Sequence, residues 1–272
     1  MKNSSVRYYP TFWQAANLVV LYIFIQTVID FPLAIYDYQK GTDLLYAPWI
    51  KMPVFFISTV FILYLGYRYT GLDFGKVFPV KRFNLLVIPA MILTFEGLQY
   101  FLNEISIRLD KVLPPPGWFM ELFSRLFDSD LGLWGGIMRV VVIAPIVEEL
   151  IFRGLIMTGF MRNYRVWVAI FYSTLMFALF HLNPWQFPAT FMLGLALGWV
   201  RFRTGSILAC IAGHAIHNGL VFIAVSNYKV LNDIKILQPG LALNYLLHGF
   251  LFISGLYAIF LVTKPYMARQ PE

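Results

Sequence analysis

Apolar runs close to the length of a membrane span recur from one end of this chain to the other. A helix needs about 20 apolar residues to cross the hydrocarbon core of a bilayer. With 59% hydrophobic and 13% charged residues, the 272-residue chain is also too apolar for an ordinary soluble domain. We therefore predict an all-α, polytopic membrane protein of about eight transmembrane helices that forms one integral membrane domain over residues 1–272. The predicted spans are approximately residues 12–36, 49–69, 84–105, 132–160, 165–182, 185–202, 205–226 and 241–263.

The tryptophans support this segmentation independently of hydropathy. Tryptophan is enriched at the headgroup level of membranes, and six of the seven tryptophans fall near the ends of the predicted spans, namely Trp13, Trp49, Trp134, Trp167, Trp185 and Trp199. An outer-membrane barrel is excluded because the alternating segments of about 10 residues that it requires are missing from the sequence. The single cysteine, Cys210, lies within a predicted span, so disulfide bonds play no part.

The net charge of +7 comes from lysines and arginines that are spread over the loops and form no basic stripe. Anionic lipid headgroups therefore explain the charge better than nucleic acid does. The excess of Lys and Arg in alternate loops, with Lys76, Lys81 and Arg82 contributing most, predicts that both termini are cytoplasmic. We expect membrane lipid as a partner, no nucleic acid, and a location in the inner membrane of a prokaryote.

One connecting segment has an amphipathic pattern. In residues 118–127, apolar side chains recur at helical spacing directly after Pro114, Pro115, Pro116 and Gly117. We predict one interfacial amphipathic helix here, which would lie in the plane of the membrane surface beside a lateral entrance for a membrane-bound substrate. A plain connecting helix is the alternative.

Two adjacent carboxylates and a guanidinium lie within residues 144–154 of the apolar run from 132 to 160. Charges at bilayer depth are costly and usually mark a functional path. Residues four apart share a face of a helix, so Glu149 and Arg153 are predicted to form a structural ion pair, whereas Glu148 points elsewhere and remains available for chemistry. Pro145 cannot donate a helical hydrogen bond, and a local kink is expected beside the carboxylates.

Two other spans carry polar residues that could complete a site. His181 ends the fifth span, and His214 and Asn218 share one face of the seventh. If these faces turn inward with Glu148, they provide the proton acceptor, acid–base imidazole and hydrogen-bond donors that peptide hydrolysis requires. No serine or cysteine nucleophile accompanies them, so attack by an activated water fits better than a covalent intermediate.

Further polar and small residues have less specific interpretations. Glu96, Gln99 and Asn103 form a stripe on the third span, for which we favour a structural role over a place in the site. His217 is an alternative to His214, although we also favour a structural role for it. In the sixth span, the Gly-x-x-x-Gly pattern of Gly194 and Gly198 predicts close helix packing.

Three motifs occur in order on separate predicted spans: Glu148-Glu149-x-x-x-Arg153, Phe177-x-x-x-His181 and His214-x-x-x-Asn218. Together they resemble the CAAX protease and bacteriocin-processing family of intramembrane proteases, which includes the type II CAAX prenyl endopeptidases. The resemblance covers a catalytic core of about residues 132–226. It implies that Glu148 and His181 activate water and that His214 and Asn218 stabilise the oxyanion. It also implies that Glu149 and Arg153 fix the position of the helix that carries Glu148, Glu149 and Arg153, which is called the motif helix below.

We therefore hypothesise that the protein is an intramembrane endopeptidase that cleaves a membrane-associated substrate. The sequence does not decide whether this substrate is a prenylated, CAAX-like peptide. We favour a metal-free reaction without cofactors. The alternative is a zinc enzyme in which Glu148, His181 and His214 are the three protein ligands. Two other functions remain: a transporter or channel in which the buried charges relay protons or ions, and an inactive family member that acts as an immunity or assembly factor.

Overall fold

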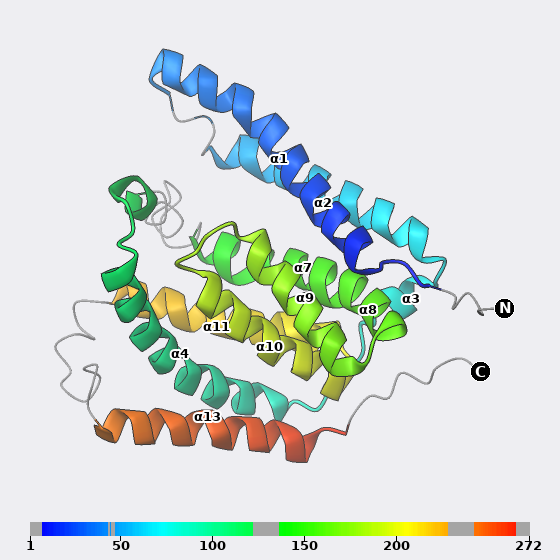
Figure 1. Ribbon diagram of the computed structural model, residues 1–272, viewed down its shortest axis with the longest axis vertical. Coiled ribbons are helices and arrows are strands. Elements are labelled where there is room, and N and C mark those ends of the chain that lie inside the picture. The colour runs from blue at the N-terminus through cyan, green and yellow to red at the C-terminus, as the bar shows by residue number, and fades with distance from the viewer. Residues whose placement is uncertain (1–6, 43, 45–46, 122–135, 228–241, 265–272) are drawn as a thin grey trace.

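The computed structural model describes residues 7–42, 44, 47–121, 136–227 and 242–264, and within these ranges all regular structure is helical (Figure 1). The predicted all-α class is therefore confirmed, and each predicted span overlaps a helix or a run of consecutive helical segments. The elements are α1 (Phe12–Lys40), α2 (Pro48–Thr70), α3 (Phe74–Val77), α4 (Val87–Val112), the π-helix η2 (Ile137–Ile143), α7 (Ala144–Glu149), the π-helix η3 (Leu150–Ile156), α8 (Met157–Asn163), α9 (Val166–Phe180), α10 (Phe187–Thr204), α11 (Ile207–Ser226) and α13 (Ala242–Val262).

Four of the described helices are long and apolar enough to cross a bilayer: residues 12–40, 52–70, 207–226 and 242–262. The chain is thus an integral membrane protein, but a count of eight spans is not confirmed. Helix α9 has only 15 residues, which corresponds to about 22 Å and is shorter than a hydrocarbon core of about 30 Å. The motif helix is divided into short π and α segments, so no single element of it reaches spanning length.

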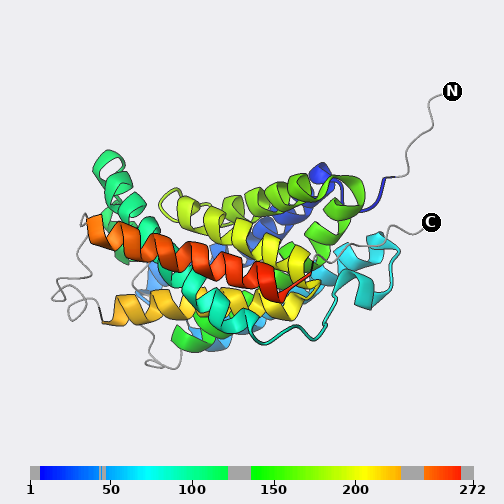
Figure 2. The ribbon, with the colours of Figure 1, turned by 90° about the horizontal axis from the view of Figure 1, so that it is seen from below.

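The helices form a central group flanked by two pairs (Figure 1). α1 and α2 pack together at one edge, and α4 and α13 pack together at the opposite edge. Between them, α7 to α11 hold fully buried side chains such as Phe152, Leu155 and Phe177. Seen from below, α13 runs along α4 (Figure 2), and α4 in turn packs on α11. The core therefore lies around the motif helix.

The outer faces of the flanking helices are apolar and exposed. Phe24 on α1, Ile57 on α2 and Phe250 on α13 each expose more than half of their surface. Exposed apolar surface on this scale is unusual for a soluble monomer. On helices of spanning length it is the surface that contacts lipid tails.

Glycines allow close helix approach at the centre of the fold. A Cβ atom added at Gly194 of α10 would lie 2.8 Å from Thr174 Cγ2 of α9, and one at Gly198 would lie 2.9 Å from Ile170 Cγ2. Real Cβ contacts are longer than this, so the two backbones could not approach as closely with larger residues. The packing role predicted for the Gly-x-x-x-Gly pattern is confirmed.

The predicted interfacial helix is only partly within the described residues. Residues 117–121 are helical, and the Trp118 side chain is exposed. Residues 122–127 lie outside the described residues, so the length and position of this helix stay predictions.

Candidate active site

The motif helix departs from α geometry on both sides of the paired carboxylates. It runs from η2 through the six-residue α7 into η3 and α8, and Glu148 and Glu149 are the last two residues of α7. Pro145 follows directly on η2 inside a continuous run of helical backbone, and it has no N–H to donate to the preceding turn. π-Helical turns are rare and are frequent at functional sites. The two carboxylates therefore stand at a junction between helix types.

Glu149 and Arg153 are paired inside the protein. Arg153 Nη1 donates to Glu149 Oε1 at 3.0 Å, and both side chains are 0% exposed. Arg153 Nη2 also donates to the Gly194 carbonyl of α10 at 3.2 Å, and its guanidinium lies 4.4 Å from the ring centre of Phe177. The pair thus has the geometry expected from its four-residue spacing, and it joins the motif helix to α9 and α10.

His214 of α11 lies between the two carboxylates. Its Nδ1 is 2.8 Å from Glu149 Oε1, and its Nε2 is 3.8 Å from Glu148 Oε2. Because an ionised carboxylate only accepts hydrogen bonds, Nδ1 carries a proton and donates it to Glu149. This bond fixes the tautomer and turns Nε2 towards Glu148. Glu149 therefore orients His214 as well as Arg153, a contact that the sequence did not reveal.

Phe177 holds both histidines of the candidate site. The His181 and His214 rings lie edge-on to Phe177, with ring centres 5.0 and 5.7 Å from its own. His181 Nδ1 is bonded to the Phe177 carbonyl at 2.9 Å, which fixes the ring at the end of α9 and leaves Nε2 for another partner. Phe177 belongs to one of the three motifs, yet the motif spacing alone did not show that its ring contacts His181, His214 and Arg153.

Asn218 ties α11 to the start of the motif helix. Its Nδ2 donates to the Val140 carbonyl of η2 at 2.8 Å. An amide nitrogen carries two protons, so one remains for a substrate. On α11, Asn218 lies one turn beyond His214 on the same helix face.

Residues 130–220 match the family model described as type II CAAX prenyl endopeptidase Rce1-like. The predicted family resemblance is confirmed. The Rce1-like segment contains all three motifs and the helices that carry them. The UPF0177 protein YajF of Lactococcus lactis subsp. lactis strain IL1403 is 25% identical over 209 residues, which cover 72% of this chain and 96% of that protein. No solved structure matches the chain.

A catalytic zinc site in the Rce1-like segment would need three protein ligands grouped around one point. In the parts of the chain that the structure describes, no three His, Cys, Asp or Glu side chains are grouped so that they could hold a metal ion. Glu148, His181 and His214, the alternative ligand set, therefore do not form a tripod of the kind that catalytic zinc requires. We derive no step that passes through a metal.

His217 lies apart from the carboxylates. Its ring is buried and edge-on to Phe95 of α4, at 5.7 Å between ring centres. Its Nδ1 has no hydrogen-bond partner among the described residues. His217 thus faces α4, whereas His214 faces the motif helix, and the two histidines are not interchangeable.

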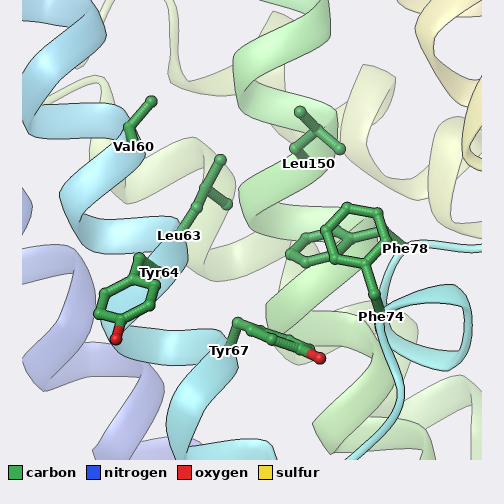
Figure 3. A pocket seen from close by; sticks show the side chains of 7 residues that line it. All are labelled: Val60, Leu63, Tyr64, Tyr67, Phe74, Phe78 and Leu150. Carbon is green, nitrogen blue, oxygen red and sulfur yellow. The ribbon is translucent and has the colours of Figure 1, made fainter.

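An apolar pocket of about 360 Å³ lies beside the Rce1-like segment, between α2, the α3 region and η3 (Figure 3). Leu150, which forms part of its wall, directly follows Glu149 in the chain. The pocket is lined by Val60, Leu63, Tyr64, Tyr67, Phe74, Phe78 and Leu150, whose side chains line the space in Figure 3. An apolar group in the membrane has a recess here next to the motif helix.

Proposed function

We propose that this protein is an intramembrane endopeptidase that hydrolyses a peptide bond by attack of a water molecule activated at Glu148. The observation that carries the proposal is the position of His214, bonded to Glu149 through Nδ1 and turned towards Glu148 through Nε2. A separation of 3.8 Å is too long for a hydrogen bond. It suits a single water that contacts both groups at about 2.8 Å.

Glu148 accepts one proton from this water, and the water oxygen forms a bond to the scissile carbonyl carbon. The carbon–nitrogen bond then breaks, and the proton held by Glu148 passes to the leaving amine, with His181 Nε2 as a second proton carrier. One water is consumed, and one carboxyl and one amine product are formed. The free amide proton of Asn218 donates to the oxyanion of the intermediate. His214 donates to it as well by entering the reaction doubly protonated, and it keeps both protons throughout, so the proton count is unchanged.

Glu149 and Arg153 act as positioning residues in this scheme. Arg153 neutralises Glu149, and Glu149 holds the His214 ring. The Arg153 bond to the Gly194 carbonyl fixes the motif helix against α10. The three helices that carry the proposed machinery, together with α10, are therefore joined through one buried network, which is the preorganisation that charge stabilisation requires.

We also propose that the substrate is a membrane-associated peptide, with an apolar group accommodated in the pocket beside Leu150. The Rce1-like family model favours a prenylated substrate, whereas an apolar wall accepts any lipid-like or aliphatic group. Membrane lipid is the other partner that we propose. The match to a bacterial protein supports a bacterial inner membrane, and the distribution of Lys and Arg supports cytoplasmic termini.

Activity is tested with purified full-length protein in detergent and a library of prenylated and unprenylated peptides analysed by mass spectrometry. The expected result is cleavage at a defined bond by the wild-type protein and none by Glu148→Gln, which keeps the size of the side chain and removes the base. Asp110→Asn, at an exposed carboxylate of α4, is the control and should cleave normally. Cleavage that persists in Glu148→Gln would overturn the proposal.

A further inference from the structure

The chain makes a strained turn directly after His181. α9 ends at Phe180 with His181 as its C-cap, and Leu182 has a φ of 49°, in the left-handed region. A leucine side chain is disfavoured in that region, so such a residue persists only where its surroundings hold it. Because Leu182 is bonded directly to His181, whatever holds this turn also fixes the end of α9 that carries the proposed proton carrier.

Asn183 holds the turn against the start of α10. Its Oδ1 accepts hydrogen bonds from the backbone N–H groups of Trp185 and Gln186, at 3.0 and 3.3 Å, and its Nδ2 donates to Gln186 Oε1 at 2.8 Å. An asparagine that bonds to the backbone two residues further on is typical of tight turns. All these bonds are local, so they shape the turn without fixing its position relative to other helices.

Trp185 joins the turn to the part of the chain that follows α4. Its indole Nε1 donates to the Leu113 carbonyl at 2.7 Å. Leu113 is the C-cap of α4 and precedes the three prolines at 114–116. Because proline fixes φ, the acceptor stands on a stiff segment. The Trp185 ring also packs on Phe119, with 4.6 Å between ring centres. Trp185 therefore anchors the turn on an element outside the Rce1-like segment.

We propose that Trp185 is a positioning residue of the active site, whose bond to Leu113 anchors the 182–186 turn and thereby keeps His181 Nε2 where it can pass a proton to the leaving amine. His181 Nδ1 is bonded to the Phe177 carbonyl at 2.9 Å, so the ring moves with the last turn of α9 when the chain beyond it shifts. This inference rests on the proposed peptidase function. It makes the end of α4 a support of the site, although α4 lies outside residues 130–220.

The test is the kinetics of Trp185→Phe, which keeps an aromatic ring against Phe119 and removes the indole N–H. Loss of one hydrogen bond predicts a fall in kcat of about 5-fold, with KM within about twofold and an unchanged melting temperature. Adding Leu182→Asn should recover part of the lost kcat, because asparagine tolerates left-handed φ and favours the turn without the anchor. Trp167→Phe, at a side chain of α9 that is 65% exposed, is the matched control and should leave kcat unchanged. Unchanged kcat in Trp185→Phe, a fall matched by a lower melting temperature, or no recovery with Leu182→Asn would overturn the inference.

A second measurement separates this inference from the proposed function. The chain has four histidines, so in NMR spectra of protein with isotope-labelled histidine the imidazole resonances of His181 are identified as those lost in His181→Gln. We expect these resonances to shift in Trp185→Phe and to stay in place in Trp167→Phe, whether or not a substrate has been found. Wild-type protein that cleaves no peptide would refute the peptidase, whereas unmoved His181 resonances would refute the role of Trp185.

Discussion

Replacement of Arg153 by alanine is the sharpest test of the buried network. The Arg153 side chain is fully buried, bonds to Glu149 Oε1 at 3.0 Å and to the Gly194 carbonyl at 3.2 Å, and covers the Phe177 ring. Its removal leaves the Glu149 carboxylate buried with His214 as its remaining ionisable partner. Breaking one side of a buried ion pair costs about 3–5 kcal/mol. That is a large share of a total stability of roughly 5–15 kcal/mol.

This loss corresponds to a decrease in melting temperature of roughly 6–20 °C, at about 2–4 °C per kcal/mol for a chain of this size. Thermal unfolding of the purified protein in detergent, followed by circular dichroism, measures it. The matched control is Arg108→Ala, which breaks a Glu104–Arg108 pair of the same four-residue spacing on α4. Arg108 is 73% exposed and lies 3.7 Å from Glu104, whose side chain is 11% exposed and also accepts a hydrogen bond from the Tyr245 hydroxyl. Because Glu104 keeps that donor when Arg108 is removed, the loss should cost about 0–1 kcal/mol.

The outcome also distinguishes a positioning role from a catalytic one. An Arg153→Ala protein that melts at the wild-type temperature and has lost turnover would show that Arg153 acts on the substrate, and would refute the structural reasoning. Replacing both partners by apolar residues of similar size should restore part of the lost stability, because no uncompensated charge then remains.

Three further predictions concern packing, substrate and metal. Gly194→Ala should destabilise the protein by about 1–3 kcal/mol, because the new Cβ meets Thr174 and Phe177. Gly75→Ala is the control and should leave stability unchanged, because a Cβ there has no neighbour within 4 Å. Urea titration in detergent measures the free energy of unfolding of both variants. Matched prenylated and unprenylated peptides should differ in KM if the pocket beside Leu150 accepts the prenyl group, and equal constants would remove that role. Elemental analysis should find no stoichiometric zinc in active protein; bound zinc that is lost in both His181→Ala and His214→Ala would contradict the metal-free scheme.

The elements of this fold follow from local features of the chain. Apolar runs of spanning length predict helices at α1, α2, α11 and α13, and the four-residue spacing of Glu149 and Arg153 predicts their contact. The three motifs identify the helices that carry the site. All of these features depend on neighbours within about one or two helical turns, so periodicity and hydropathy are sufficient to find them.

The contacts between helices were decided by the tertiary structure. The Glu149–His214 bond, the contact of the Phe177 ring with His214 and the stacking of Tyr22 on Phe180 each join residues of different helices. Such contacts depend on how each helix is rotated about its axis and how closely its neighbours approach, and small residues such as Gly194 control that approach. A hydropathy pattern in a membrane marks a helix as apolar on most faces and does not specify which face meets which neighbour. The sequence by itself therefore determined which helices form and which residues are chemically able to act, whereas packing between helices decided which of those residues meet.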